Sequence, residues 1–280
     1  MFYRRKLLLA LLQKLGGEVS PLVVQNLLFL ISRQNQVYEF IPYTKGCHSL
    51  TLESDLELYR QEPWDESFIT EQDEKLIEKT LGNFKNEEEL LKKGAEAEPY
   101  YTIKSDYFTN LNLSEAFYRE RKRIIEEINE SPVALYTIGY EGLSIEAFIN
   151  LLIKHNVQRI IDVRGNPNSR KRDFAKKSFA DYLNKAGIEY IGMSEIGIPN
   201  KVKREYLKVN RKKDLFEWYE KNVLRTNIDK VEVISSLAQE VNSALVCYEG
   251  NPNDCHRSYL AKACQKSTPS LKVFHLPLLE

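Results

Sequence analysis

The sequence is poor in the features of secreted and membrane proteins. Its 280 residues include four cysteines, whose spacing shows no disulfide framework: Cys47, Cys247, Cys255 and Cys264. This excludes a small fold stapled by disulfides, and a reduced cytoplasmic protein is the expectation. No stretch of about 18 uncharged apolar residues occurs, so no membrane span is expected.

The N-terminus has the outline of a short signal peptide, because the basic residues 4–6 precede an apolar run at 7–12. No small-residue cleavage site follows, and Gln13 and Lys14 interrupt the run. We therefore expect an amphipathic helix over residues 4–15, with the glycines that follow it as its end.

The formal net charge is zero, but the charge is unevenly distributed. Residues 1–130 carry 17 Lys and Arg against 23 Asp and Glu, a net charge of −6, whereas residues 131–280 carry 23 against 17, a net charge of +6. Only the second half suits anionic partners such as a nucleotide or a nucleic acid. The stretch 53–98 holds 15 acids and 6 bases, which argues against strong DNA binding by that surface.

Residues 1–84 are predicted to form a small α+β module that resembles a winged helix. Ser20 is a good N-cap for a helix that begins at Pro21. A strand is predicted at 37–43 and a turn at 45–48, followed by a helix from 49 to 59. Modules of this kind bind DNA or contact other proteins, and both roles stay open.

Residues 85–130 are predicted to form a charged linker and a helix. The segment 85–98 is charged and lacks β-branched residues, which is typical of a solvated helix or a linker. Ser114 is placed to cap the helix that follows, and the Ser131-Pro132 pair marks a domain boundary.

From residue 131 to residue 280 strands alternate with helices, which predicts an α/β domain with a mostly parallel sheet flanked by helices. The strands are expected at 134–139, 158–164, 188–191, 244–248 and 271–276. In such sheets ligands bind beyond the carboxyl ends of the strands.

Three segments that leave predicted strands are rich in polar residues and glycine, namely 137–142, 162–167 and 247–252. If the sheet is parallel, all three meet at one edge and form a site. We expect the first segment to contribute Thr137, Gly139 and Tyr140 to substrate binding.

The second segment offers an arginine for phosphate binding. Strand alternation puts Asp162 and Arg164 on the same face, so Arg164 either forms an ion pair with Asp162 or binds the ligand. The loop beyond it is rich in bases, Arg170 among them, and a guanidinium suits phosphate oxygens. A solvated loop explains the same run of charges.

The third segment leads to a predicted helix capped by Asn253 or Asp254. Backbone N–H groups at a helix start attract anions, and His256 and Arg257 would strengthen that attraction. Cys255 lies where a thiol becomes more acidic, which makes it a candidate nucleophile. The alternative for Cys255 is an inert core cysteine, and the same interpretation applies to Cys247 and Cys264.

A metal site is not expected from the spacing. Cys247, Cys255 and His256 are arranged as C-x7-C-H, which matches no compact zinc motif. Glu249 is a candidate general base or nucleophile, or else a partner for one of the arginines. The sequence therefore predicts catalysis by Glu249, Cys255 and His256 without a metal or another cofactor.

A second basic region covers 201–206 and 211–213. Tyr206, Trp218 and Tyr219 are interspersed with it or follow it, and bases with aromatic rings can hold unpaired nucleotides. An amphipathic solvated helix explains the pattern equally well.

Together these motifs resemble the domain-of-unknown-function family numbered 488. The resemblance rests on an ordered set of motifs between residues 135 and 276: Thr137-Ile138-Gly139-Tyr140, Asp162-Val163-Arg164, Gly187-Ile188-Glu189-Tyr190, Glu195-Ile196-Gly197, and Cys247-Tyr248-Glu249 through Cys255-His256-Arg257. It implies Arg164, Glu249, Cys255, His256 and Arg257 as site positions. The chain departs from the family pattern at Tyr140-Glu141, where relatives carry a polar residue such as His, and at Ile196-Gly197-Ile198, where many carry Leu-Gly-Gly.

Two functions lead as hypotheses, and a third, a small-molecule enzyme that uses the same anion site, also stays open. The first is an enzyme that acts on a nucleotide or a nucleic acid, by hydrolysis or group transfer at a base or a glycosidic bond. The second is a non-catalytic regulator that senses a nucleotide or a nucleic acid, with a link to defence or toxin–antitoxin systems because the N-terminal module is similar to antitoxin-like modules. In both, the N-terminal module is available for DNA, a protein partner or a dimer.

Overall fold

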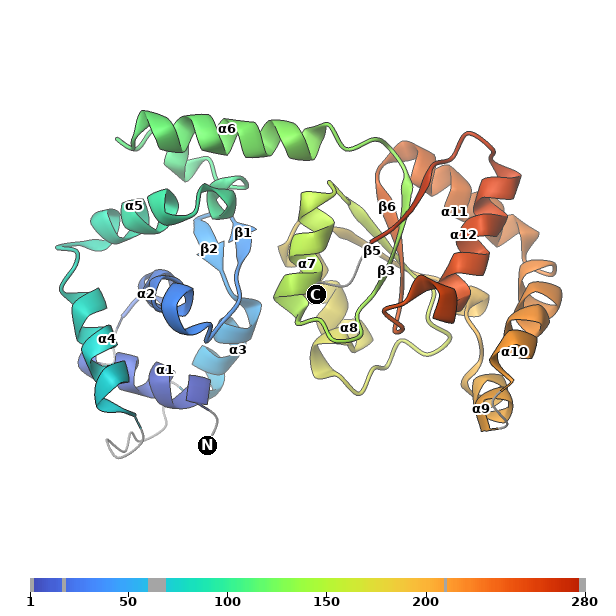
Figure 1. Cartoon of the computed structure of the whole chain (residues 1–280), viewed down its shortest axis with the longest axis horizontal. Coiled ribbons are helices and arrows are strands. Elements are labelled where there is room, and N and C mark those ends of the chain that lie inside the picture. The colour runs from blue at the N-terminus through green and yellow to red at the C-terminus, as the bar shows by residue number, and fades with distance from the viewer. Residues whose placement is uncertain (1–2, 17–18, 60–68, 209–210, 277–280) are drawn as a thin grey trace. The chain divides into compact units, whose positions relative to one another are not determined.

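The computed structural model describes residues 3–16, 19–59, 69–208 and 211–276, and the chain divides into two compact units, Met1–Glu127 and Ile128–Glu280 (Figure 1). Each unit has a hydrophobic core of its own. We describe the two units separately.

The first unit consists of helices and one small antiparallel hairpin. Its elements are α1 (Tyr3–Lys14), α2 (Pro21–Asn35), β1 (Ile41–Tyr43), β2 (Gly46–His48), α3 (Leu50–Tyr59), α4 (Glu71–Leu81), α5 (Glu87–Ala97), the 3-10 turns η2 (Pro99–Thr102) and η3 (Tyr107–Thr109), and α6 (Glu115–Asn129). The Ser20 hydroxyl accepts a hydrogen bond from Val23 N, which confirms the predicted cap. The predicted turn at 45–48 is wrong, because the chain reverses earlier and Gly46, at φ +100°, already begins β2.

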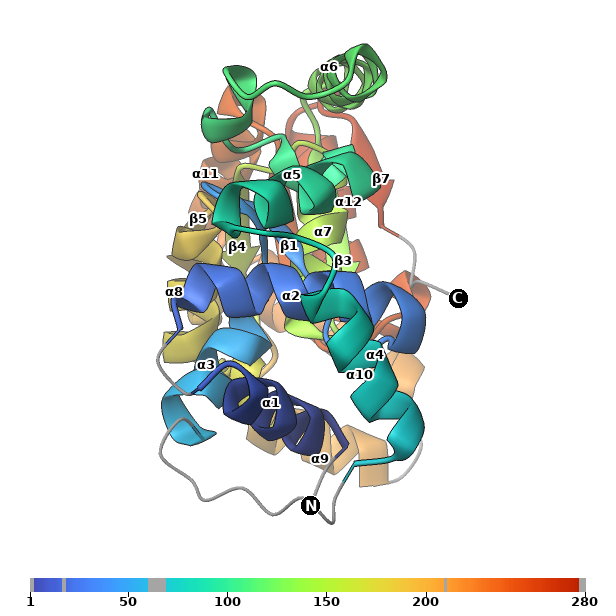
Figure 2. The same cartoon turned by 90° about the vertical axis from the view of Figure 1, so that its left-hand side faces the viewer.

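Helix α2 is the centre of this unit and packs against α4, α5 and β2 (Figure 2). Its residues Leu27, Leu28 and Ile31 are fully buried. Helix α5, in the segment expected as a charged linker, also buries Leu90 in this core. The likeness to a winged helix stays a prediction.

The second unit contains a five-stranded, wholly parallel sheet in the order β5-β4-β6-β3-β7, which confirms the predicted fold class. Its elements are β3 (Leu135–Gly139), α7 (Ile145–Lys154), β4 (Arg159–Asp162), η4 (Arg172–Phe174), α8 (Lys176–Lys185), β5 (Glu189–Gly192), η5 (Ser194–Ile196), α9 (Asn200–Lys208), α10 (Lys212–Tyr219), the π-helical turn η6 (Glu220–Leu224), α11 (Ile228–Glu240), β6 (Ser243–Cys247), η7 (Pro252–Asp254), α12 (His256–Ser267) and β7 (Val273–His275).

Helices cover both faces of this sheet. Helices α7 and α8 lie on one face, and α11 and α12 lie on the other (Figure 1). Phe148 of α7, Phe174 of η4 and Phe179 of α8 contact one another through their aromatic rings. On the opposite face Leu245 of β6 and Leu260 of α12 belong to one continuous core. Because both faces of the sheet are covered, the central strands β3 and β6 are buried at every residue.

The strand order brings the ends of β3, β4 and β6 together. Strand β6 lies between β3 and β4, with Gly139 paired to Cys247 and Asp162 paired to Val246. Glycines allow the loops beyond these ends to touch. A Cβ atom on Gly139 would lie 1.9 Å from the carbonyl oxygen of Glu249, and one on Gly165 would lie 2.2 Å from that of Ile198. The predicted convergence of three loops is therefore found.

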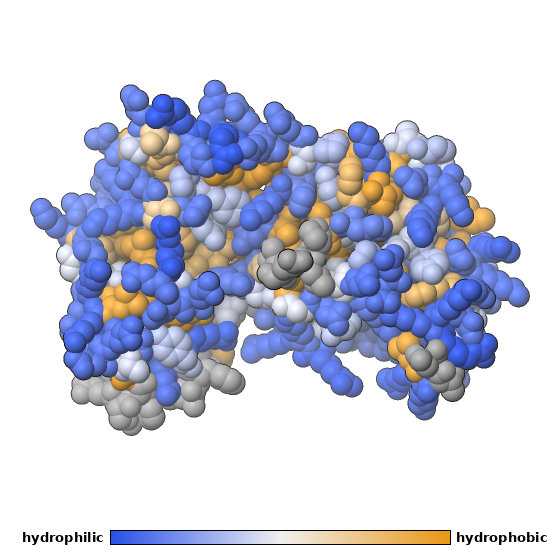
Figure 3. All heavy atoms as spheres, in the orientation of Figure 1, coloured by the Kyte–Doolittle hydropathy of each residue, from blue (hydrophilic) through white to orange (hydrophobic). Residues whose placement is uncertain are grey.

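The face of each unit that is visible in Figure 3 is mostly polar. Figure 3 shows hydrophilic side chains over much of the visible face, with small apolar areas among them. Within the described residues no helix is long and apolar enough to cross a membrane.

Candidate active site at the carboxyl ends of the strands

A pocket with a volume of about 180 Å³ opens where β3, β4 and β6 end. It is lined by the loops that follow these strands, by α9 and α10, and by the start of α12. The lining residues are Tyr140, Arg164, Gly165, Asn166, Ile198, Asn200, Lys203, Leu207, Lys212, Leu215, Phe216, Cys247, Tyr248, Glu249, Asp254, Cys255 and His256.

The structure brings five of the predicted site residues to this pocket: Tyr140, Arg164, Glu249, Cys255 and His256. Four others, Thr137, Gly139, Asp162 and Arg257, are not among the lining residues and lie close behind them in the strands and in α12. Arg170 is exposed and does not line the pocket.

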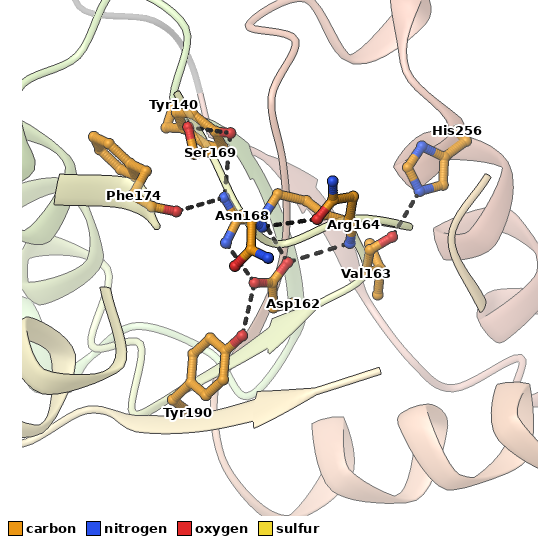
Figure 4. A network of polar contacts seen from close by, with 10 residues as sticks. Tyr140, Asp162, Val163, Arg164, Asn168, Ser169, Phe174, Tyr190 and His256 are labelled. Carbon is orange, nitrogen blue, oxygen red and sulfur yellow. Dashed lines mark hydrogen bonds and ion pairs between the residues drawn. The ribbon is translucent and has the colours of Figure 1, made fainter. Parts of the chain in front are cut away.

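Arg164 is held in a buried ion pair, which is one of the two alternatives that the sequence left open. Its Nε donates to Asp162 Oδ1 at 2.8 Å, and one terminal nitrogen donates to Asp162 Oδ2 at 2.6 Å (Figure 4). The other terminal nitrogen donates to Tyr140 Oη at 3.2 Å and to the carbonyl oxygen of Phe174 at 2.8 Å. Every guanidinium nitrogen thus has a protein partner, so Arg164 shapes the pocket wall.

Two tyrosines complete this network. Tyr190 Oη donates to Asp162 Oδ2 at 2.8 Å. The ring of Tyr140 stacks on Phe174 with centroids 4.3 Å apart, and its hydroxyl donates to Ser169. Burial raises the pKa of Tyr190, and the Asp162 carboxylate raises it further, so this hydroxyl remains a donor.

Arg257 has the same structural character. It is fully buried and donates to the carbonyl oxygens of Glu249 and Gly250 and to Thr137 Oγ1. These bonds tie α12 to the loop after β6 and to strand β3. The guanidinium therefore fixes the backbone that carries Glu249, and its predicted role in phosphate binding has no support from this geometry.

Cys247, Cys255 and His256 form a compact cluster in the pocket. The Sγ atoms of Cys247 and Cys255 lie 3.7 Å and 3.8 Å from His256 Nδ1. All three side chains are buried, and their ligand-type atoms lie within 4.8 Å of one another. The interpretation of Cys247 as a plain core residue is therefore incomplete, because its thiol lines the pocket.

Helix α12 begins one to two residues later than predicted, and this places Cys255 at its start. Cys255 is the N-cap residue, with an extended backbone at φ −134° and ψ 141°, and its side chain makes no capping hydrogen bond. Asn251 instead accepts a hydrogen bond from Asn253 N and begins the short turn η7. The thiol of Cys255 is thereby left to face Cys247 and His256.

The electrostatics of the cluster favour a thiolate on one cysteine only. Burial opposes ionisation of Cys255, but hydrogen bonds from Cys247 and His256 outweigh it and set its pKa well below the usual range. The hydrogen bond to Cys255, together with burial, raises the pKa of Cys247. Burial opposes protonation of His256, yet the neighbouring Cys255 raises its pKa. Cys255 therefore has the environment of a reactive cysteine.

Glu249 stands beside this cluster as a carboxylate. Its Oε1 pairs with Lys203 Nζ at 2.5 Å, and Cys247 Sγ donates to its Oε2 at 3.3 Å. Burial opposes ionisation of Glu249, but the ammonium of Lys203 overrides it and lowers the pKa to about 2. The sequence suggested Arg164 or Arg257 as the partner of the Glu249 side chain, but the partner is Lys203. Arg257 donates only to the backbone carbonyl oxygen of Glu249.

Three of the pocket residues that sequence reasoning did not assign to the site are Lys203, Lys212 and Tyr248. Lys203 of α9 and Lys212 of α10 belong to the second basic region, and nothing in their spacing shows that these helices reach the strand ends. Tyr248 is 47% exposed and lines the pocket. Its position directly after a buried strand and before Glu249 is the signal by which the sequence could have identified it.

The comparisons with known proteins agree with the resemblance seen in the sequence. The model of the family described as "Domain of unknown function DUF488" matches residues 144–264. No curated protein and no solved structure matches the chain. The matched range includes Arg164, Glu249 and the Cys255-His256-Arg257 run, and it begins after the Thr137–Tyr140 motif. Residues 144–264, in the C-terminal part of this chain, thus match the DUF488 family model.

Proposed function

We propose that the C-terminal unit is an enzyme that acts on a nucleotide or a nucleic acid, by hydrolysis or group transfer at a base or a glycosidic bond. One observation carries the proposal. Glu249, Cys255 and His256, which can exchange protons or attack a bond, line the same pocket as two lysines and an exposed tyrosine. This combination of reactive, cationic and aromatic groups suits a substrate with a phosphate and a base.

The lysines are the cations available to a phosphate. Lys203 and Lys212 both line the pocket, and their side chains are 36% and 42% exposed. Each also pairs with a carboxylate, Lys203 with Glu249 and Lys212 with Asp254, so substrate phosphate would compete with these partners. The donors of Arg164, in the pocket wall, and of Arg257, behind it, are already engaged with protein acceptors.

Tyr248 supplies a surface for the base. An exposed aromatic ring beside cations can stack on any nucleobase, and such stacking contributes about 1–3 kcal/mol per base. The amide side chains of Asn166 and Asn200 also line the pocket and offer both donors and acceptors to a base edge. We assign the bond chemistry to Glu249 and Cys255, with His256 as the proton-transfer partner of Cys255.

The N-terminal unit is the proposed site of contact with DNA, a protein partner or a second copy of the chain. Its α2 helix and β1–β2 hairpin are the elements on which the winged-helix-like prediction rests. The four free cysteines fit the cytoplasmic setting that we propose for the whole chain.

The test is turnover on a panel of nucleosides, nucleotides, and single- and double-stranded DNA and RNA. Glu249→Gln and Cys255→Ala should each lower the rate by roughly 10²-fold or more, because they remove proton transfer or the nucleophile. Binding of the same ligands should persist. Salt-dependent binding without turnover in the wild-type chain would favour the non-catalytic regulator instead, and absence of any binding would contradict both functions.

A further inference from the structure

The Cys247, Cys255 and His256 cluster has the dimensions of a metal site. In a tetrahedral zinc site, Zn–S bonds of about 2.3 Å and Zn–N bonds of about 2.0 Å place a sulfur and a nitrogen ligand about 3.6 Å apart. The two Sγ–Nδ1 distances here are 3.7 Å and 3.8 Å. The three ligand atoms all lie within 4.8 Å of one another, so small side-chain movements would let Cys247, Cys255 and His256 surround one ion.

The histidine is already oriented for metal binding. His256 Nε2 lies 3.0 Å from the carbonyl oxygen of Val163 (Figure 4), and a carbonyl can only accept, so Nε2 carries the proton. In the neutral ring Nδ1 then has a free lone pair, which faces the two sulfurs. Metal-bound histidines commonly donate their second ring N–H to a backbone carbonyl, which fixes the tautomer and the ring orientation. Tyr219 packs edge-on against the same ring and restricts it further.

The three side chains are also held by rigid elements. Cys247 is the last residue of the central strand β6, and Cys255 and His256 begin α12. Adjacent Cys and His residues can both bind here because Cys255 has an extended backbone and His256 is the first helical residue. The pocket gives an ion and a fourth ligand a route from solvent, since all three residues line it.

We infer that Cys247, Cys255 and His256 bind a zinc ion, with the fourth position open to water or substrate in the pocket. Three protein ligands with one open position are typical of catalytic zinc sites, whereas structural sites have four. Two thiolates and one neutral imidazole favour Zn²⁺ over Mg²⁺ or Ca²⁺, which prefer oxygen ligands.

The next step rests on the proposed function and assigns a specific role to Glu249. With zinc bound, Cys255 and His256 are ligands in place of nucleophile and proton-transfer partner, and Glu249 alone carries the proton transfer. Glu249 lines the same pocket as the three ligands, and its Oε2 lies 3.3 Å from Cys247 Sγ, so its carboxyl group is within reach of a molecule at the open position. A zinc-bound water would transfer one proton to Glu249, and the resulting hydroxide would form a bond to the carbon of a C–N bond in the substrate. The C–N bond then breaks, and the leaving nitrogen takes the proton back from Glu249. Water is consumed, and no oxidant or reductant is needed.

The test measures metal content and Co²⁺ spectra of the full-length chain, prepared with Zn²⁺ and then freed of loosely bound metal. The wild type should retain one zinc per chain, and Co²⁺ substitution should produce an intense sulfur-to-cobalt charge-transfer band. Cys247→Ser, Cys255→Ser and His256→Asn should each bind zinc at least about tenfold more weakly, and either serine variant should weaken the charge-transfer band. Cys264→Ser is the matched control, because Cys264 is an equally buried free thiol that does not line the pocket.

Each outcome decides the inference. Wild-type chain without stoichiometric zinc and without the charge-transfer band would overturn it, as would ligand variants that bind like Cys264→Ser. Because the wild-type spectrum needs no variant, a serine variant that fails to fold leaves the test intact. Glu249→Gln should keep the zinc, and loss of the metal in this variant would overturn the open fourth position.

Failure of the inference and failure of the proposed function give different results. Zinc bound without turnover on the nucleic-acid panel supports the metal site and contradicts the enzyme. Turnover without bound metal supports the enzyme, with Cys255 as its nucleophile, and contradicts the zinc site.

Discussion

Two regions of the second unit meet at the pocket, one around Arg164 and one around His256, and their polar groups differ in how fully they are hydrogen-bonded. Around Arg164 every guanidinium nitrogen donates to Asp162, Tyr140 or a backbone oxygen, and Asp162 accepts from Tyr190 as well. Around His256 the two sulfur atoms lie 3.7 Å and 3.8 Å from Nδ1, and all three side chains line the pocket. A saturated network stabilises a fold, whereas sulfur and nitrogen atoms that face a pocket are available to a ligand. The comparison separates the residues that build the pocket from the residues that act in it.

The largest expected effect is on stability, at the buried ion pair between Asp162 and Arg164. Asp162→Ala should lower the free energy of unfolding by about 3–5 kcal/mol, because it leaves the Arg164 guanidinium buried without its carboxylate. Denaturant unfolding checks this. Asp181→Ala is the control, since Asp181 is an exposed residue of α8, and it should change stability by no more than about 0.5 kcal/mol. Equal losses in the two variants would remove the distinction between the regions.

The contact of two loops should be the next most sensitive feature. Gly139→Ala would place a Cβ 1.9 Å from the Glu249 carbonyl oxygen, and backbone has to move to relieve the clash. A loss of about 3 kcal/mol is expected, at the upper end of overpacking effects. Gly192→Ala is the matched control, because its Cβ would meet only the Tyr190 side chain at 3.6 Å. Thermal unfolding of both variants gives the answer, and a Gly139→Ala chain as stable as Gly192→Ala would contradict the close approach.

Among the residues that face the ligand, Tyr248 should contribute to ligand binding and little to the stability of the fold. Tyr248→Ala should weaken binding of a nucleoside monophosphate by about 1–3 kcal/mol, because it removes the stacking surface. Tyr248→Phe keeps the ring and should bind like the wild type. Titration calorimetry with each variant measures the difference, and unchanged affinity in Tyr248→Ala would remove the tyrosine from the site.

The smallest effect should come from the partly exposed pair at the pocket rim. Lys203→Met breaks the ion pair with Glu249, but with 36% of the lysine side chain exposed the loss of stability should stay within about 0–1 kcal/mol. Chemical denaturation of this variant beside Asp162→Ala sharpens the comparison. A loss of unfolding free energy as large as that of Asp162→Ala would show that Lys203 stabilises the fold as strongly as the buried ion pair does.

Much of the fold could be predicted because it depends on local patterns. The alternation of strand-like and helix-like segments identified all five strands of the sheet, and Ser20 and Ser114 cap helices as their sequence context indicated. The parallel order then placed the three polar loops together. Whether Arg164 would pair with Asp162 or face a ligand could not be predicted, because both depend on the packing of Phe174 and Tyr140 around the guanidinium.

The cluster of thiols and imidazole was the least predictable part of the site. The spacing between Cys247 and Cys255 matches no metal motif, yet the end of β6 and the start of α12 face each other across the loop at 248–254. Lys203 was equally hidden, since α9 reaches Glu249 only through the tertiary fold. Contacts between segments far apart in the chain carry no signal in a single sequence.

Alkylation of the four cysteines is the most direct test of the distinction between residues that stabilise the pocket and residues that react in it. The native chain, freed of metal, would be treated briefly with iodoacetamide and the labelled positions identified by peptide mass spectrometry. Cys255, which lines the pocket and has a lowered pKa, should react first, whereas burial raises the pKa of Cys264 to about 11 and also raises that of Cys47. Added Zn²⁺ should slow the labelling of Cys255. Labelling of Cys264 or Cys47 as fast as Cys255 would contradict the account.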